Sequence, residues 1–379
     1  MVPERFTARG PRTMRCVVAI ARNTLSETVR QPAYALVLVA CCSVIALAPR
    51  FSGHIYTYGA GSNLDKPAER MVATLGLSTL LVAGIILGAV STINVVSREI
   101  ENRTAMTVLS KRVGRWQFIL GKNLGVGVAV GAACGACLLL LLLILRAGVN
   151  ITNKDAADTG IMLSILAILL VSLAAATLRN YYWGRAWVGT FTLFFMALVM
   201  LAFLGYCLVD KEYYSVFAPP TGEIFNSLHY DNRVRVGVTY DWEVMKAGLA
   251  SIASVLVMTA IAMAASTRLA PGGNLAVTAI IGLLGLTSQY FRDRLGESMA
   301  DSVAWTRYDA AGGATIPEMA YNVYYALVPN LQHLWLSEAL ERENAIPWPY
   351  VGMAVLYAAL YGLAMVFLSV FLFGRREVG

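Results

Sequence analysis

The stretch of residues 123–145 reads NLGVGVAVGAACGACLLLLLLIL and contains no charged side chain. A helix needs about 20 apolar residues to cross the hydrocarbon core of a bilayer, because it rises only about 1.5 Å per residue. This stretch therefore predicts a transmembrane helix, and the rest of the chain can be compared with it.

The composition of the whole chain agrees with a membrane location. Of its 379 residues, 58% are hydrophobic and only 14% are charged. Soluble globular domains are about 45–50% apolar and about 25% charged. A soluble fold of this length could not bury so much apolar surface, so lipid must be the solvent for part of the chain.

Seven other charge-free stretches are long enough, or nearly so, to cross a bilayer. They lie near 33–49, 71–97, 159–178, 186–209, 247–267, 269–291 and 349–373. Together with 123–145 they predict an all-α polytopic membrane protein with about eight transmembrane helices. No segment between them is large enough to fold as a soluble domain, so residues 1–379 are expected to form a single transmembrane domain.

A ninth charge-free gap, 319–337, is not predicted to span the bilayer. It contains polar residues such as Asn330 and His333, which are costly in lipid. Its tyrosines and Trp335 suit the membrane interface. We expect this gap to form an interfacial or a re-entrant element within a long outer segment, 292–348.

The distribution of charge orients the predicted helices. If eight helices cross and the N-terminus is cytoplasmic, both termini, the segments 98–122 and 179–185 and the short turn at Arg268 lie inside. The inner segments then carry 17 of the 30 Lys and Arg residues but only 5 of the 23 Asp and Glu residues. Basic inner loops are the usual pattern of membrane proteins. The net charge of +7 is therefore interpreted as orientation in the cell membrane, and not as nucleic-acid binding.

Residues 12–30 are predicted to form an amphipathic helix before the first span. Apolar side chains recur at helical spacing in this segment: Met14, Val17, Val18, Ala21, Leu25 and Val29. Arg15, Arg22 and Glu27 lie off that stripe. A basic amphipathic helix beside a membrane should lie in the plane of the headgroups. The alternative is a helix that packs on another cytosolic domain.

The stretch 123–145 carries Gly127, Gly131 and Gly135 on one helix face. Glycines at this spacing allow two helix backbones to approach closely, which is a main source of helix association in lipid. A contact inside the bundle is favoured over one between subunits, which stays open. Cys134 and Cys137 form a lone C-x-x-C in the same stretch, and we interpret them as small packing residues, because a redox or metal site needs access and more ligands.

The predicted spans contain no Asp, Glu, Lys, Arg or His. Ion-coupled carriers usually bury ionisable groups in the membrane, and intramembrane enzymes and metal sites need a base or ligands there. Gly121-Lys122 does not complete an ATP-binding P-loop, because the position that requires glycine is Trp116. We therefore expect the chain not to be an enzyme and to bind no metal, and we expect a partner to supply the energy for any uphill transport.

The inner segment 98–122 reads REIENRTAMTVLSKRVGRWQFILGK and is dense in charge of both signs. An ordinary solvated loop is one interpretation. The segment also resembles the inner loop of ABC-2-type permeases, which are the membrane subunits of a class of ATP-driven transporters. The residues that carry the resemblance are Glu99 or Glu101, Arg103-Thr104, Leu109-Ser110-Lys111, Arg115 and Gly121-Lys122. One departure is Arg112, where the family commonly has proline.

Two further segments fit the same resemblance. The helix at 12–30 is similar to the elbow helix of this family. Pro329-Asn330-Leu331 resembles an element of one branch, which also ends in two arginines, as at Arg375-Arg376. Typical members have six spans, so the hydrophobic pair at 247–291 would be an addition to a six-helix core.

The resemblance implies a permease that pairs with a second permease chain, the same or a related one, and with cytosolic ABC ATPase subunits that bind ATP and Mg. Such a complex would export an unidentified substrate across the cell membrane. The residues that would couple this chain to the ATPase are Glu99, Glu101, Arg103, Thr104, Lys111 and Arg115. The alternatives are an ATPase-independent secondary carrier or channel, and a structural or sensory membrane protein without transport.

Overall fold

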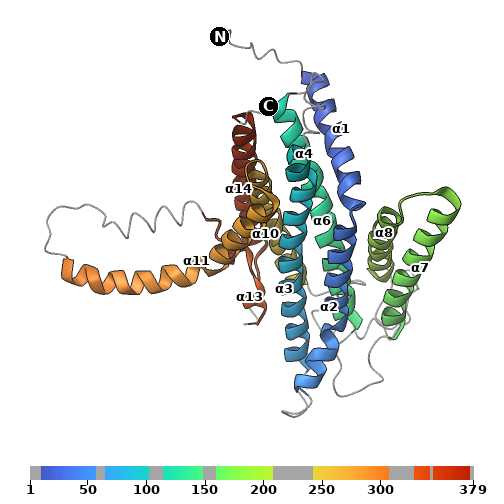
Figure 1. Cartoon of the computed structure of the whole chain (residues 1–379). Helices are drawn as coiled ribbons and strands as arrows, with labels where there is room; N and C mark the ends of the chain where they lie inside the picture. The colour runs from blue at the N-terminus through green and yellow to red at the C-terminus, as the bar shows by residue number, and fades with distance from the viewer. Residues whose placement is uncertain are drawn as a thin grey trace, which may run out of the picture.

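The computed structural model describes residues 10–56, 65–101, 114–147, 159–207, 242–306, 328–341 and 345–375. Within these ranges the chain is almost entirely helical and has no strand. Eight of the helices are long and apolar enough to cross a bilayer, and Figure 1 shows most of them side by side in one bundle. The prediction of an all-α, multi-span membrane protein is therefore confirmed.

The eight candidate spans match the predicted spans in number and order. They are α2 (Pro32–Tyr56), α3 (Asp65–Thr92), α6 (Arg115–Ala147), α7 (Thr159–Trp183), α8 (Trp187–Cys207), α10 (Trp242–Ser266), α11 (Pro271–Thr306) and α14 (Trp348–Gly374). Two short elements continue α3 without a break, the π-helix η1 (Ile93–Ser97) and α4 (Arg98–Glu101). A further helix, α1 (Gly10–Val29), precedes the first span.

The helices extend beyond the charge-free stretches and carry charged side chains near their ends. Lys122 and Arg146 lie in α6, and Lys246 lies in α10. These three residues are 4%, 3% and 8% exposed, respectively. Each lies within two turns of a helix end, that is, within about 11 Å of it along the axis. A charged side chain near a helix end can be satisfied at lower cost than one at the bilayer centre.

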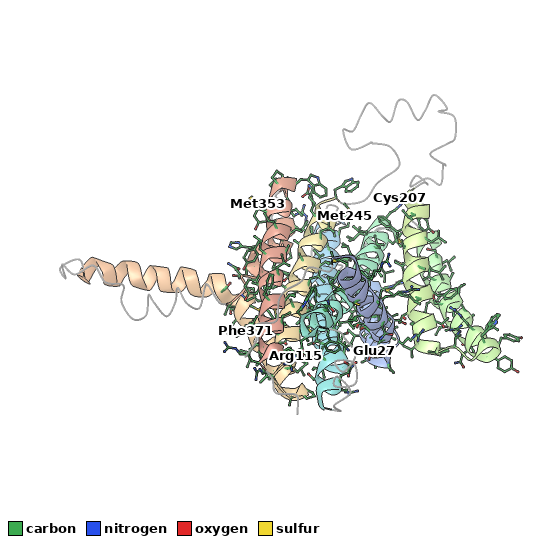
Figure 2. All side chains as sticks on the ribbon, turned by 90° about the horizontal axis from the view of Figure 1, so that it is seen from above. Glu27, Arg115, Cys207, Met245, Met353 and Phe371 are labelled. Carbon is green, nitrogen blue, oxygen red and sulfur yellow. The ribbon has the colours of Figure 1, made fainter. Side chains whose placement is uncertain are left out.

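Helices α6 and α10 occupy the centre of the bundle. α10 is the most buried of the candidate spans and packs against α3, α6 and α14, whereas α14 is the least buried. α7 and α8 pack mainly on each other, and Figure 2 shows this pair on one side of the bundle and α14 on the other. The outer faces of these helices are apolar; Leu170 and Phe367 are both more than half exposed, as expected of surfaces that contact lipid.

The predicted glycine face of α6 makes no close approach among the described residues. A Cβ on Gly127 or Gly131 would lie 4.0 or 3.9 Å from Leu256, which is ordinary van der Waals contact, and one on Gly135 would meet nothing within 4 Å. By contrast, a Cβ on Gly84 of α3 would lie 2.6 Å from a side chain of α10. Gly127 and Gly131 thus lie beside Leu256 of α10 without a close backbone approach, and whether these glycines also serve a contact between subunits stays a prediction.

Two described parts of the expected outer segment 292–348 contain helices. Helix α11 does not end with its apolar part but continues to Thr306, and Figures 1 and 2 show it extending away from the bundle. Farther along the chain, residues 328–341 form the 3-10 helix η2 (Gln332–Leu334) and the short helix α13 (Ser337–Glu341).

The described part of the ninth gap turns back into the bundle. Leu331 and Leu334 are fully buried. The backbone N–H of Leu331 donates to the carbonyl of Gly285, which lies within the apolar part of α11, at 3.2 Å. From residue 328 onward the described part of the segment is therefore packed inside the bundle, and whether it is interfacial or re-entrant stays open.

Candidate functional site

Lys122 lies where α3 and α14 end and α6 begins, which we call the Lys122 end of the bundle. Its Nζ forms an ion pair with Oε2 of Glu99 in α4 at 2.6 Å and donates to the carbonyl oxygen of Val95 in η1 at 2.9 Å. Nζ also lies 5.0 Å from the ring centroid of Phe118, a favourable position for a cation. These partners make the burial of the ammonium group tolerable, because a buried charge is costly unless it is paired and hydrogen-bonded.

The carbonyl of Val95 belongs to the π-helix that follows α3. Hydrogen bonds in a π-helix run over five residues instead of four, and such turns are rare and often found at functional sites. On another side of the same turn, Asn94 Nδ2 donates to Gln31 Oε1 between α1 and α2 at 3.1 Å. The irregular turn is thus held both by α6, through Lys122, and by the α1–α2 junction.

The first turns of α6 also form the surface on which α1 packs, which we call its seat. A Cβ on Gly121 would lie 3.0 Å from the carbonyl oxygen of Val17, and one on Gly125 would lie 2.6 Å from that of Ala21. Only residues without side chains let the two backbones come this close. Gly121 and Gly125, rather than the predicted glycines farther along, therefore make the close helix contact of α6.

The apolar stripe predicted on residues 12–30 is divided between two faces of α1. Val17 and Val29 are buried, as expected, but Met14 and Val18 are 71% and 63% exposed. Thr24, which is not part of the stripe, is buried beside the seat on α6. Small and hydroxyl-bearing side chains fit the narrow space between the two helices better than large apolar ones.

Glu27 of α1 brings a second carboxyl group to the Lys122 end. Burial raises the pKa of this carboxyl, attraction to Lys122 opposes the rise, and repulsion from Glu99 adds to it. Figure 2 shows Glu27 on α1, between α6 and the α7–α8 pair. Two carboxyl groups on different helices therefore act on one buried ammonium group, and a movement of either helix would change the balance between them.

The last turn of α14 is joined to the same place. The ring of Phe118 stacks on that of Phe373, with centroids 5.9 Å apart. Nη1 of Arg115 donates to the carbonyl oxygen of Gly374 at 3.0 Å. A cation at the C-terminus of a helix is favourable, because the carbonyl groups there lack partners within the helix.

The predicted coupling residues fall into two groups. Glu99 and Arg115 are described, and both bind within the chain, Glu99 to Lys122 and Arg115 to the end of α14. The remaining residues lie outside the described side chains: Glu101, Arg103, Thr104 and Lys111. Glu99 is therefore turned toward the bundle by its described ion pair.

Sequence reasoning missed two members of this cluster. Lys122 was expected only as part of the Gly121-Lys122 pair that ends the inner segment and carries the family resemblance, and Glu27 only as a polar residue off the apolar stripe. The signals were present: Lys122 directly precedes the longest glycine-rich span, and Glu27 is the single acidic residue among residues 10–30. A lone charge of opposite sign next to an apolar stretch is a candidate for a buried pair.

A second buried lysine lies at the opposite end of the bundle, the Lys246 end. Its Nζ contacts Oε1 of Glu243 at 2.7 Å and donates to the carbonyl oxygen of Ile346 at 2.8 Å. Oε2 of Glu243 accepts from the backbone N–H of Ile346 at 2.7 Å. Lys246 also lies 5.4 Å from the ring centroid of Trp348, so α10 holds the start of α14 by both backbone groups of one residue.

The predicted element Pro329-Asn330-Leu331 lies between α11 and α14. The backbone N–H of Asn330 donates to the hydroxyl oxygen of Tyr357 at 3.0 Å, and Asn330 Oδ1 accepts from the N–H of Gln332 at 3.1 Å. Irregular backbone inside a membrane protein needs such partners, because lipid offers none. The described contacts of this element are thus those of a turn buried between spans.

Four cysteines meet where α2 packs on α6. Cys41 and Cys42 are buried against Cys134 and Cys137, and the Sγ atoms of Cys42 and Cys137 lie 3.7 Å apart. In the ranges that the structure describes, no three His, Cys, Asp or Glu side chains are arranged to hold a metal ion. The burial of these thiols agrees with their interpretation as packing residues.

A scan of known protein families finds none that matches the chain, and a search of curated proteins finds no match either. The function must therefore be argued from the geometry of the described residues.

Proposed function

We propose that the chain is the permease subunit of an ABC-2-type transporter, which exports a substrate with energy supplied by a separate cytosolic ATPase. The observation that carries this proposal is the ion pair between Glu99 and Lys122. These two residues flank the segment 102–113, so the pair joins the helix before that segment to the helix after it. A force applied to the segment would reach α3 and α6 together.

The Lys122 end has two features that a coupling joint needs, where a coupling joint is a contact that passes movement from one helix to another. The π-helix η1 is an irregular turn in an otherwise continuous helix, and such a turn can be converted at low cost. Glu27 offers Lys122 a second carboxyl group on another helix, α1. In the proposed mechanism, closure of the ATPase shifts α4 as a rigid body, and the resulting movement of η1 and α6 opens the bundle on its other side.

The proposal divides the coupling residues by role. Glu99 positions the joint, because it is bound to Lys122. Charged and polar residues of the intervening segment would face the ATPase, where complementary charge sets orientation: Glu101, Arg103, Thr104 and Lys111. ATP and Mg would be bound by the partner, because Gly121 and Lys122 both lie within α6 and are used in packing and pairing.

A second permease chain would pack on α6 near Gly135, where an added Cβ would meet nothing within 4 Å in the described structure. In this proposal α10, part of the pair expected to be an addition, is also the most buried candidate span, so the added pair would be packed into the bundle and not attached at its edge.

Purification of the tagged full chain from its native membrane tests the proposal. The chain should bring with it a cytosolic protein that contains an ATP-binding P-loop, and the mixture should hydrolyse ATP. Charge reversal by Glu101→Lys together with Lys111→Glu should lower the recovery of that protein at least about fivefold, the effect of losing about 1 kcal/mol.

The matched control reverses the charges of Arg179 and Arg185, which lie on the other predicted inner loop. This change should leave the recovery unaltered. Transport by the chain alone in proteoliposomes, without any ATPase, would establish the alternative hypothesis that the chain is a secondary carrier or channel. Recovery of neither an ATPase nor a transport activity would favour the structural or sensory reading.

A further inference from the structure

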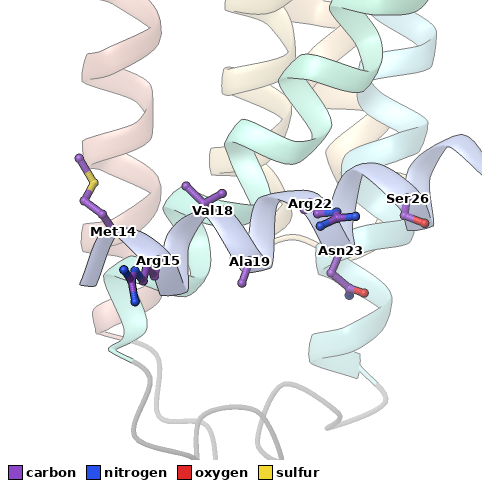
Figure 3. A pocket seen from close by; sticks show the side chains of 7 residues that line it. All are labelled: Met14, Arg15, Val18, Ala19, Arg22, Asn23 and Ser26. Atoms are coloured by element: carbon purple, nitrogen blue, oxygen red, sulfur yellow. The ribbon is translucent and has the colours of Figure 1, made fainter. Parts of the chain in front are cut away.

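The outward face of α1 forms an open groove of about 690 Å³ that the proposed function does not use. The described residues that line it belong to α1: Met14, Arg15, Val18, Ala19, Arg22, Asn23 and Ser26. Figure 3 shows how these side chains are arranged around the helix. The opposite side of α1 packs on α6, and among the described residues no other element covers this face.

The face is divided into three strips. Met14 and Val18 form an apolar edge, and Figure 3 shows both pointing to the side on which the spans rise. Ala19 and Asn23 point to the opposite side. Arg15 and Arg22 lie between these edges, seven residues apart and therefore about 10 Å apart along the helix axis.

The two arginines carry charge that the described part of the protein does not neutralise. Within the described ranges, neither guanidinium group forms an ion pair or a hydrogen bond. Both residues are exposed. Guanidinium groups bind phosphate oxygens in forked geometry, so an anion with a phosphate group matches this strip.

We propose that this face of α1 binds anionic phospholipids, with the phosphate groups held by Arg15 and Arg22 and the acyl chains against Met14 and Val18. The order of the strips supports a lipid over a soluble anion or an acidic protein. An anion in water would leave the apolar edge exposed, whereas a phospholipid presents phosphate and hydrocarbon in the order in which α1 presents arginine and apolar side chains. The proposal needs only that the candidate spans lie in a bilayer, and it holds whether or not an ATPase is the partner.

A photo-crosslinking amino acid at Ala19, the small residue between the two arginines, tests the proposal. The full chain is placed in bilayer discs that contain equal amounts of phosphatidylglycerol and phosphatidylcholine, and the crosslinked lipids are identified by mass spectrometry. Phosphatidylglycerol should be enriched among them. Arg15→Gln and Arg22→Gln should each reduce the enrichment of phosphatidylglycerol by about fivefold. The loss cannot go further than the ratio of the two lipids in the bulk bilayer.

Two controls separate this site from general attraction. Arg179→Gln with Arg185→Gln removes two positive charges from the end of α7 and the turn that follows it, where both residues are exposed, and should leave the enrichment at Ala19 unchanged. The same crosslinker at Leu360, on the exposed apolar face of α14, should report the bulk lipid ratio.

Several outcomes would overturn the proposal. They are a bulk lipid ratio at Ala19, crosslinks to protein instead of lipid, and equal loss of enrichment in the Arg179 and Arg185 control. If the crosslinker disturbs the helix, the lipids that co-purify with the otherwise unaltered chain provide the second measurement. Phosphatidylglycerol should then be retained by the parent chain and lost from the variant with both Arg15→Gln and Arg22→Gln.

Discussion

The two buried lysines use nearly the same set of partners at opposite ends of the bundle. Lys122 contacts a glutamate at 2.6 Å and a backbone carbonyl at 2.9 Å, and lies 5.0 Å from the centroid of a phenylalanine ring. Lys246 contacts a glutamate at 2.7 Å and a carbonyl at 2.8 Å, and lies 5.4 Å from the centroid of a tryptophan ring. What differs is where those partners lie in the chain.

At the Lys246 end the ion pair is local. Glu243 and Lys246 lie three residues apart on one helix, and together they bind both backbone groups of Ile346. Neither charge can move without the whole of α10. This end is a fixed attachment between two spans.

At the Lys122 end the partners come from separate elements. Glu99 and Val95 belong to a helix with a π turn, Lys122 belongs to α6, and Glu27 approaches from α1. Relative movement of these elements changes the partners of the lysine. The same chemistry thus holds one end together and makes the other end adjustable, which is why the adjustable end is the better candidate for coupling.

Replacement of Lys122 by methionine should have the largest effect. The substitution keeps the length of the side chain but leaves the Val95 carbonyl and the Glu99 carboxylate without their donor. The unfolding free energy should fall by about 2–3 kcal/mol, somewhat below the usual cost of breaking a buried pair, because Glu99 is 26% exposed. Amide hydrogen exchange over 93–101 should rise at least about tenfold.

In the proposed complex, Lys122→Met should also uncouple ATP hydrolysis from transport. Unchanged exchange over 93–101 in the variant would show that Lys122 does not hold the π turn, and the comparison between the two ends would lose its basis.

The same substitution at Lys246 should have a smaller and purely local effect. Glu243 is 33% exposed and can be hydrated once its partner is gone, so the loss of stability should be about 1–2 kcal/mol. Amide exchange should rise at the start of α14, at 346–351, and not at 93–101. ATP hydrolysis and transport should stay coupled. Uncoupling by Lys246→Met would contradict the distinction between a fixed and an adjustable end.

The spans could be predicted from sequence, because lipid permits only long apolar helices to cross it. The burial of Lys122 and Lys246 could not, because a charge next to an apolar stretch has the same sequence whether it faces water or a partner. For Lys122, the partner Glu99 lies 23 residues away in the sequence and Glu27 lies 95 residues away. Only the packing of α1, α4 and α6 brings these three residues together.

The glycines show the same limit. Glycines recur every fourth residue twice in this region, at Gly121 and Gly125 and again from Gly127 to Gly135. Both sets satisfy the rule for close helix packing. Only the first meets another helix backbone in the described structure, because α1 is short and lies against the first turns of α6. Spacing identifies a face that can pack closely, but not which neighbour will occupy it.

Alanine substitutions at two glycines test how easily the contacts near each end of the bundle can yield. A Cβ on Gly125 would lie 2.6 Å from the backbone oxygen of Ala21, whereas one on Gly248 would meet only the end of the Leu138 side chain. A backbone group cannot rotate away, so Gly125→Ala should cost about 1–3 kcal/mol and displace α1. Gly248→Ala should cost less, because Leu138 can change its rotamer.

Thermal unfolding in detergent measures both variants, and Gly135→Ala on the same helix serves as the neutral control. Equal losses of stability in Gly125→Ala and Gly248→Ala would mean that the α1 backbone moves aside as easily as the Leu138 side chain changes its rotamer.

The smallest effect expected is a pH dependence of stability that Glu27 confers on the Lys122 end alone. Because burial raises the pKa of Glu27 above its ordinary value of 4.5, the folded chain binds this proton more tightly than the unfolded chain. Stability from this group is therefore fully present below pH about 4.5 and is lost as the pH rises through the raised pKa. Glu27→Gln should remove that loss, which melting curves of both chains between pH 4 and 8 would reveal.

The two lysines decide whether this dependence is local. Lys122 attracts the Glu27 carboxylate and so lowers its pKa, which means that Lys122→Met should move the window of lost stability to higher pH. Lys246→Met should leave the window in place, because Lys246 belongs to the opposite end. A shift with Lys246→Met, or none with Lys122→Met, would show that the acid senses the bundle as a whole. A shift with Lys122→Met alone would show that Glu27, Glu99 and Lys122 form one electrostatic unit, which is what an adjustable joint requires.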